Sequence, residues 1–123
     1  MSKRIMVVDD SRIVQLQMQK VLADSQYEVA VCCKNGQEAI EKYETEKPDL
    51  ITMDILMPGI DGLEAARQII EKHPDAKILM VSSLAYDDTM QEANKIGAKG
   101  FIYKPFDREQ VLKCLDDIFA ENE

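Results

Sequence analysis

Apolar and polar residues follow two patterns that alternate along the chain. Short, nearly continuous apolar runs, such as RIMVV at residues 4–8 and KILMV at residues 77–81, are typical of strands buried on both faces of a sheet. Such runs predict strands at residues 4–8, 27–32, 49–53, 77–81 and 100–103. Stretches in which apolar residues recur every three or four positions predict helices at residues 11–24, 35–46, 61–72, 87–96 and 107–119, with Gly97 ending the fourth.

The regular alternation of strand and helix favours an α/β fold in which helices cover both faces of a parallel sheet. Right-handed crossovers leave few possible topologies for such a sheet. The chain has 123 residues, which is the usual size of one domain. Only residues 120–123 lie beyond the last predicted helix. We therefore expect residues 1–123 to form a single domain without an output domain.

The composition indicates a cytoplasmic protein. No apolar run approaches the length of a membrane-spanning helix, about 20 residues, and the first residues lack the apolar stretch of a signal peptide. Cys32, Cys33 and Cys114 have no metal-ligand spacing and are expected to be buried or half-buried reduced thiols. The net charge of −8 and the lack of a Lys/Arg cluster argue against direct binding of nucleic acid.

Polar residues stand where four of the five predicted strands end. The first strand runs into Asp9 and Asp10, the third into Asp54, the fourth into Ser82 and the fifth into Lys104. In open parallel sheets, ligands bind beyond the carboxyl ends of the strands, at the point where the strand order reverses. If the first and third strands flank that point, these side chains share one crevice.

Taken singly, these residues have ordinary explanations. Asp10 or Ser11 is a suitable cap for the first predicted helix. Ser82 is suitable for a turn, and Lys104 for the surface. The shared position of the whole set at strand ends is harder to explain in this way, and it favours a common functional site.

Two further polar residues are given no part in this site. Asp61 precedes the third predicted helix, and Glu64 follows three residues later, which resembles a helix-capping box. The single histidine, His73, precedes Pro74 near the end of the same helix. We interpret it as a surface residue without a catalytic role.

Three carboxylates in one crevice repel one another and favour the binding of a cation. All-oxygen ligands suit Mg²⁺, or Mn²⁺ as a similar hard ion. A carboxylate held beside such an ion and a lysine can accept a phosphoryl group, because the two cations neutralise charge on the transferring oxygens. Asp54 then stands at the rim of the sheet because it is the nucleophile of a phosphoryl transfer.

Four blocks of sequence resemble those of response-regulator receiver domains in two-component signalling. They are VVDD at residues 7–10, DLITMDILMPGIDG at 49–62, ILMVSS at 78–83 and GFIYKPF at 100–106, in the order and spacing of that family. The likeness covers nearly the whole chain and is greatest to stand-alone receivers of the kind that act in chemotaxis. It implies a flavodoxin-like fold of five strand–helix units with strand order 2-1-3-4-5.

The resemblance also implies roles for the acidic residues. Asp54 is the phosphoacceptor and takes the phosphoryl group from a phosphohistidine of a sensor histidine kinase. Asp10 and Asp54 are ligands of Mg²⁺ together with the backbone carbonyl of Leu56, and Asp9 holds the ion through water. The domain is not expected to be an enzyme beyond its own phosphorylation and dephosphorylation.

Three further positions are implied to respond to phosphorylation. The Ser82 hydroxyl and the Lys104 ammonium group bind the phosphoryl group, and Phe101 is the aromatic residue whose rotation reports it. The Lys104–Pro105 peptide bond is implied to be cis. Ser82 replaces the more usual threonine and keeps the hydroxyl, whereas Phe101 replaces a frequent tyrosine and lacks one.

The family's output properties are expected here as well. Residues 87–119 are implied to bind a downstream protein, in chemotaxis or in a phosphorelay, and the chain is expected to be a monomer or a weak, phosphorylation-dependent dimer without membrane insertion. The side chains of Leu56 and Leu84 are implied to lie beside the phosphoryl group. Leucine has no polar group that could position an attacking water, so we expect a comparatively long-lived phosphorylated state.

Three other classes of protein fit parts of the pattern. A phosphatase of the haloacid-dehalogenase type needs an aspartate two residues after its nucleophile, where this chain has Leu56. A flavodoxin-like electron carrier needs a loop rich in hydroxyl groups and glycine after the first strand, where Asp9 and Asp10 repel phosphate. The remaining alternative is a receiver-like interaction module that is not phosphorylated, and retention of the full set of site residues argues against it.

Overall fold

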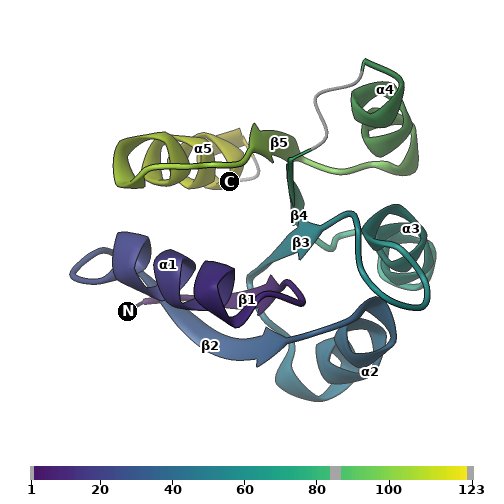
Figure 1. The fold of residues 1–123 in the computed structure, drawn as a ribbon, viewed down its shortest axis with the longest axis horizontal. Helices are drawn as coiled ribbons and strands as arrows, with labels where there is room; N and C mark the ends of the chain where they lie inside the picture. The colour runs from purple at the N-terminus through teal and green to yellow at the C-terminus, as the bar shows by residue number, and fades with distance from the viewer. Residues whose placement is uncertain (1, 84–86, 122–123) are drawn as a thin grey trace.

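The computed structural model describes residues 2–83 and 87–121 (Figure 1). The strands are Lys3–Val8 (β1), Tyr27–Cys33 (β2), Leu50–Asp54 (β3), Ile78–Ser82 (β4) and Gly100–Tyr103 (β5). The helices are Arg12–Leu22 (α1), Gly36–Glu46 (α2), Gly62–Lys72 (α3), Asp87–Ile96 (α4) and Arg108–Glu121 (α5). The predicted types and order of these elements are confirmed.

The strands form one parallel sheet in the order β2-β1-β3-β4-β5, which is the order that the resemblance implied. β1 pairs with both β2 and β3: Val8 lies opposite Cys33 on one side and opposite Met53 on the other. The chain moves outward from β1 to β2 and then returns to the other side of β1 for β3. The switch point of the sheet therefore lies at the carboxyl ends of β1 and β3.

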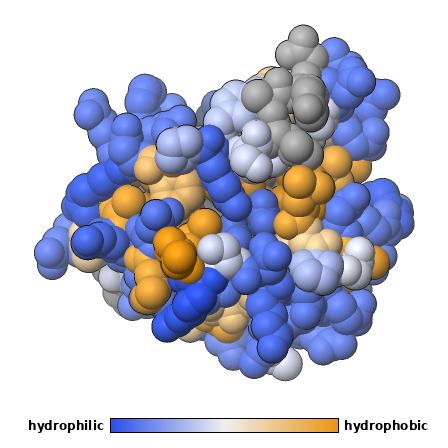
Figure 2. Space-filling view, in the orientation of Figure 1, coloured by the Kyte–Doolittle hydropathy of each residue, from blue (hydrophilic) through white to orange (hydrophobic). Residues whose placement is uncertain are grey.

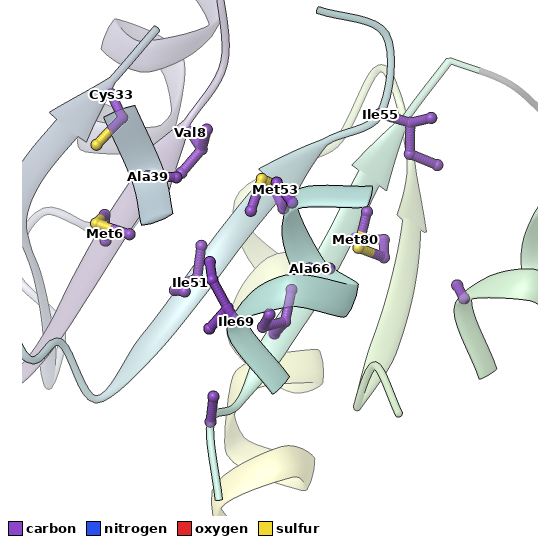
Figure 3. Close-up of a cluster of buried hydrophobic side chains, with 14 residues drawn as sticks. Met6, Val8, Cys33, Ala39, Ile51, Met53, Ile55, Ala66, Ile69 and Met80 are labelled. Atoms are coloured by element: carbon purple, nitrogen blue, oxygen red, sulfur yellow. The ribbon is translucent and has the colours of Figure 1, made fainter. Parts of the chain in front are cut away.

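Helices cover both faces of the sheet, with α1 and α5 on one face and α2, α3 and α4 on the other (Figure 1). Successive side chains of β1 point to opposite faces. Ile5 and Val7 pack in the cluster with α1 and α5, and Met6 and Val8 pack in the cluster with α2, α3 and α4, which Figure 3 shows. Burial on both faces explains why the strands read as continuous apolar runs.

Side-chain caps explain where three helices begin. Ser11, Asn35 and Asp61 each accept a hydrogen bond from the backbone N–H three residues on, at 3.3, 2.8 and 2.8 Å. Each cap is the first residue of a predicted helix, but it has extended backbone geometry, so these helices begin one residue later than predicted. α1 ends at Leu22, before the predicted residue Asp24, because the ψ of 144° at Ala23 is extended and the φ of 55° at Asp24 is left-handed.

Asp61 and His73, which lie outside the predicted site, each make a contact at an end of α3. Asp61 caps α3 as expected, but the Glu64 side chain binds the Arg67 guanidinium group and does not complete a capping box. His73 is half-buried, and its Nε2 lies 2.9 Å from Oε1 of Glu44. This contact joins the ends of α2 and α3, so the histidine is more enclosed than a simple surface residue.

The cysteines are buried or half-buried thiols, as expected from the sequence. All three cysteines are free thiols: Cys33 is buried, and Cys32 and Cys114 are half-buried.

The molecular face in Figure 2 is mostly hydrophilic, with hydrophobic residues gathered over α1 and around β3 and α3. Large apolar side chains that are exposed include Ile13 of α1 and Leu56 in the loop after β3. None of the helices in the described part of the chain is long and apolar enough to cross a membrane.

Candidate functional site

Three aspartates meet at the switch point of the sheet. Asp9 and Asp10 directly follow β1, and Asp54 is the last residue of β3. One carboxylate oxygen from each residue lies within 4.8 Å of the other two. The cause is the parallel pairing of β1 with β3, which brings the carboxyl ends of the two strands side by side. The predicted acidic cluster is therefore present.

Lys104 reaches this cluster from the end of β5. Its Nζ lies 2.7 Å from Oδ2 of Asp9 and 3.2 Å from Oδ1 of Asp54. Burial favours the neutral amine, but the hydrogen bond to Asp9 and the negative charge of Asp54 together outweigh burial and raise the pKa of Lys104. The ammonium group is therefore held in its charged form between two carboxylates. The Lys104–Pro105 peptide bond next to it is cis, the isomer that the resemblance implied.

Asp54 is nearly buried, with 6% of its surface exposed. Its Oδ1 accepts hydrogen bonds from the backbone N–H of Ile55 at 3.0 Å and from Lys104, whereas Oδ2 accepts none from the described residues. Burial, followed by the charge of Asp9, raises the pKa of Asp54, and Lys104 opposes this shift only in part.

The two aspartates after β1 have different environments. Asp9 is 2% exposed, and its Oδ1 accepts a hydrogen bond from the backbone N–H of Ser11 at 2.9 Å. Asp10 is exposed. Because Ser11 supplies the cap of α1, the ordinary explanation of Asp10 as that cap is wrong, and its carboxylate remains available to the cluster.

Gly62 is a further site residue, which lies in the sequence block at residues 49–62. A Cβ atom at this position would lie 1.8 Å from the backbone oxygen of Asp54. The Gly62 N–H also donates a 2.7 Å hydrogen bond to the carbonyl of Ile55. The first turn of α3 therefore packs against the backbone of Asp54 so closely that only glycine fits at this position. The glycine after the cap in IDG was the signal in the sequence.

Ser82 and Phe101 lie on β4 and β5, the two strands beyond β3. Ser82 is the last residue of β4 and is 1% exposed, and its carbonyl accepts the N–H of Lys104 at 2.8 Å. Phe101 is half-buried against the core on the α4 side of the sheet, with its ring centroid 5.2 Å from that of Tyr103. Of the predicted phosphoryl-binding residues, Lys104 therefore contacts the acidic cluster with its side chain. Ser82 contacts Lys104 through a backbone hydrogen bond.

The two leucines predicted to cover the phosphoryl group have separate outcomes. Leu56 lies in the loop just after β3, and 58% of its surface is exposed, so its side chain is open to solvent two residues from Asp54. Leu84 lies outside the described residues, and the prediction for it stays a prediction.

The donor set of the cluster fits a hard divalent cation. It offers carboxylate oxygens from three aspartates, the ligand type that Mg²⁺ and Mn²⁺ prefer. With the aspartates ionised, the single ammonium group of Lys104 leaves the cluster negatively charged. A divalent ion would remove the remaining repulsion between the carboxylates.

An open α/β sheet with acidic residues and a lysine at its switch point defines a receiver-type signalling domain. Residues 5–116 match the response regulator receiver domain, and the chain belongs to this family. Relatives named chemotaxis protein CheY include one from Listeria monocytogenes, which is 42% identical over 92% of this chain and 95% of its own length. Another, from Thermotoga maritima, is 40% identical over 96% of this chain and 98% of its own length. The chain is therefore a component of two-component signalling.

Solved structures agree with this assignment. A CheX–CheY–BeF3–Mg²⁺ complex from Borrelia burgdorferi contains a chain with a TM-score of 0.92 and 30% identity, over 95% of this chain and 89% of that chain. The response regulator domain of Thermotoga maritima CheB has a TM-score of 0.85 and 35% identity, over 98% of this chain and 96% of that one. Both likenesses span the whole sheet, so they support the predicted fold as well as the family.

Proposed function

We propose that Asp54 accepts a phosphoryl group from a phosphohistidine of a sensor histidine kinase. The observation that supports this most strongly is that Asp54 clusters with Asp9 and Asp10 at the end of β3, while its Oδ1 is held by Ile55 and Lys104. Oδ2 attacks the phosphorus atom, the bond between phosphorus and the histidine nitrogen breaks, and the imidazole leaves with the electron pair. The product is an aspartyl phosphate.

Lys104 stabilises the charge of the transfer in this proposal. Its ammonium group lies 3.2 Å from Asp54, so a short movement brings it to an oxygen of the phosphoryl group. The Ser82 hydroxyl is the second donor to the phosphoryl oxygens. Prepositioned donors of this kind supply most of the catalysis in phosphoryl transfer. Phe101, packed beside β4, is proposed to rotate with the movement of Ser82.

A divalent cation is the proposed cofactor. Asp10, Asp54 and the backbone carbonyl of Leu56 would hold Mg²⁺ or Mn²⁺ directly, and Asp9 would hold it through water. The bound ion supplies neutralisation of the charge on the transferring oxygens. The fit rests on the three clustered carboxylates. The related CheY from Borrelia burgdorferi forms a complex that contains Mg²⁺, which supports the same ion here.

The output is proposed to be binding of a downstream protein through the surface formed by α4, β5 and α5, residues 87–119. This surface includes Phe101 and is connected to the cluster through Ser82 and Lys104. A protein partner of a related CheY, named CheX, is present in the Borrelia burgdorferi complex. In this proposal the chain is not an enzyme beyond its own phosphorylation and dephosphorylation. Nothing favours the alternative of a receiver-like module without phosphorylation.

Phosphorylation with a small phosphodonor tests the proposal. Wild-type protein incubated with acetyl phosphate and Mg²⁺ should gain one phosphoryl group in intact-mass analysis, and Asp54→Asn should gain none. Asp117→Asn is a matched control, because Asp117 is an exposed aspartate on α5, and it should label as the wild type does. Labelling that persists in Asp54→Asn, or that does not need a divalent metal, would contradict the assignment.

A further inference from the structure

Gln15 is a buried polar residue without a part in the proposed phosphoryl chemistry. Only 7% of its surface is exposed. The other buried polar or charged residues in the described part of the chain are Asp9, Thr52, Asp54 and Ser82. These four lie in strands or directly after one, whereas Gln15 lies on the inner side of α1. Burying an amide group costs free energy unless its polar atoms form hydrogen bonds. The hydrogen bonds of the Gln15 side chain therefore indicate its role.

The Gln15 amide group binds two backbone carbonyls at the end of β1 and β2. Its Nε2 donates to the carbonyl of Asp9 at 2.8 Å and to the carbonyl of Cys33 at 3.4 Å. Both partners can only accept, so the NH₂ side of the amide must face them. Its Oε1 accepts a hydrogen bond from the Arg12 guanidinium group at 3.1 Å, which fits the same orientation. Every contact therefore indicates one fixed position for this amide.

The carbonyl of Asp9 belongs to the peptide group that joins Asp9 to Asp10. Because a peptide group is planar, holding its oxygen also fixes its N–H and the direction in which the chain enters Asp10. Asp10 is exposed, so little packing holds its carboxylate in place. The Gln15 amide reaches this peptide from α1.

We propose that Gln15 is a positioning residue for the divalent-cation site, which sets the orientation of the Asp9–Asp10 peptide and thereby the placement of both carboxylates. This inference rests on the proposed function, because it assigns a role in binding the same cation. Groups that orient metal ligands from behind change metal affinity when they are replaced. A residue that only satisfied two carbonyls would change the stability of the fold and leave the affinity of the folded protein for Mg²⁺ unchanged.

Methionine substitutions at two positions of the same helix separate these roles. Gln15→Met keeps the length of the side chain and removes its amide. Gln19→Met is the matched control one turn later on α1: Gln19 is exposed, and its amide donates to Sγ of Cys32 at 3.8 Å. Each folded protein is titrated with Mg²⁺ alone, and the change in its backbone amide chemical shifts gives the dissociation constant. Phosphorylation is not needed for this measurement.

Gln15→Met should raise the dissociation constant for Mg²⁺ about tenfold, while Gln19→Met should keep the wild-type value. Equal dissociation constants in the wild type and Gln15→Met would overturn the role of Gln15 and leave the proposed function intact. A wild type that does not bind Mg²⁺ would instead contradict the proposed function itself. If Gln15→Met does not fold, Gln15→Asn replaces it: the shorter amide cannot reach both carbonyls, and the same weakening of Mg²⁺ binding is expected.

Discussion

Nζ of Lys104 lies 2.7 Å from Oδ2 of Asp9, a carboxylate whose side chain is only 3% exposed. The same ammonium group also contacts Asp54. Before any metal binds, this lysine is thus a positive charge that lies between two carboxylates in a nearly buried crevice. The pair joins the ends of β5 and β1, which are not neighbours in the sheet.

Lys104→Met should lower the free energy of unfolding of the metal-free protein by about 2 kcal/mol, because it leaves two enclosed carboxylates without their partner. Mg²⁺ should restore part of this loss, since its charge replaces that of the ammonium group. Urea unfolding with and without Mg²⁺ measures both effects. Lys99→Met is the control, because Lys99 is an exposed lysine just before β5, and it should change little. Equal stabilities of the two variants would contradict the pairing argument.

Asp54→Asn should make the metal-free protein more stable at pH 7. Burial and the charge of Asp9 raise the pKa of Asp54, so the ionised side chain opposes folding. For a group with a raised pKa in the folded state, this opposition is absent at a pH below the pKa of the unfolded chain and develops as the pH rises through the folded-state pKa. The advantage of Asp54→Asn should therefore shrink as the pH falls toward about 4.

Chemical unfolding of the wild type and Asp54→Asn across this pH range measures the difference. The exposed Asp117, which pairs with Lys113 at the surface, provides the control: Asp117→Asn should change stability only slightly at pH 7. An advantage of Asp54→Asn that grows as the pH falls would have the wrong sign and would contradict the raised pKa.

Much of the site could be predicted from the sequence alone, because each strand is a continuous apolar run and the end of the run marks the end of the strand. Asp9, Asp54 and Lys104 each stand at such an end, and parallel pairing brings them together. Sequence could not choose between Asp10 and Ser11 as the cap of α1, since both residue types cap well. The choice depends on the Asp9 side chain, which binds the N–H of Ser11.

The pattern of apolar and polar residues could not predict close contacts between residues far apart in the sequence. Gln15 fits an inward position of the helix, but nothing in the sequence shows that two backbone carbonyls face it there. The contact of Gly62 with Asp54 depends on the path of the loop between them. Helix ends also differed by one or two residues, because a cap and the first helical residue differ in backbone angles and not in periodicity.

Gly62→Ala should reduce the free energy of unfolding by about 3 kcal/mol, because the new methyl group would collide with the backbone of Asp54. Gly59→Ala in the same loop is the matched control. Gly59 has a φ of +81° but nothing within 4 Å of an added Cβ, so only the backbone cost of about 1 kcal/mol is expected. Urea unfolding compares the two, and a larger loss in Gly59→Ala would contradict the close approach.

Ser82→Ala should weaken transmission of the signal to α4, β5 and α5. The hydroxyl is proposed to bind the phosphoryl group, and a hydrogen bond to a charged group contributes about 2 kcal/mol, which shifts a two-state equilibrium by more than about tenfold. Amide chemical shifts of residues 100–103 on phosphorylation should move less in this variant than in the wild type. Ser83→Ala, at an exposed neighbour, should respond as the wild type does. Equal responses in the wild type and Ser82→Ala would refute this role.

Leu56→Asn should shorten the life of the phosphorylated state. Leu56 stands two residues after Asp54 with 58% of its surface exposed, and it has no polar group to hold a water in line with the bond between Asp54 and phosphorus. An amide that positions this water by one hydrogen bond would stabilise the transition state by about 1 kcal/mol, which corresponds to about fivefold faster hydrolysis. The decay of labelled protein after removal of acetyl phosphate measures the rate. Leu16→Asn, at an exposed leucine of α1, should keep the wild-type rate, and unchanged or slower decay in Leu56→Asn would show that Leu56 does not set the lifetime.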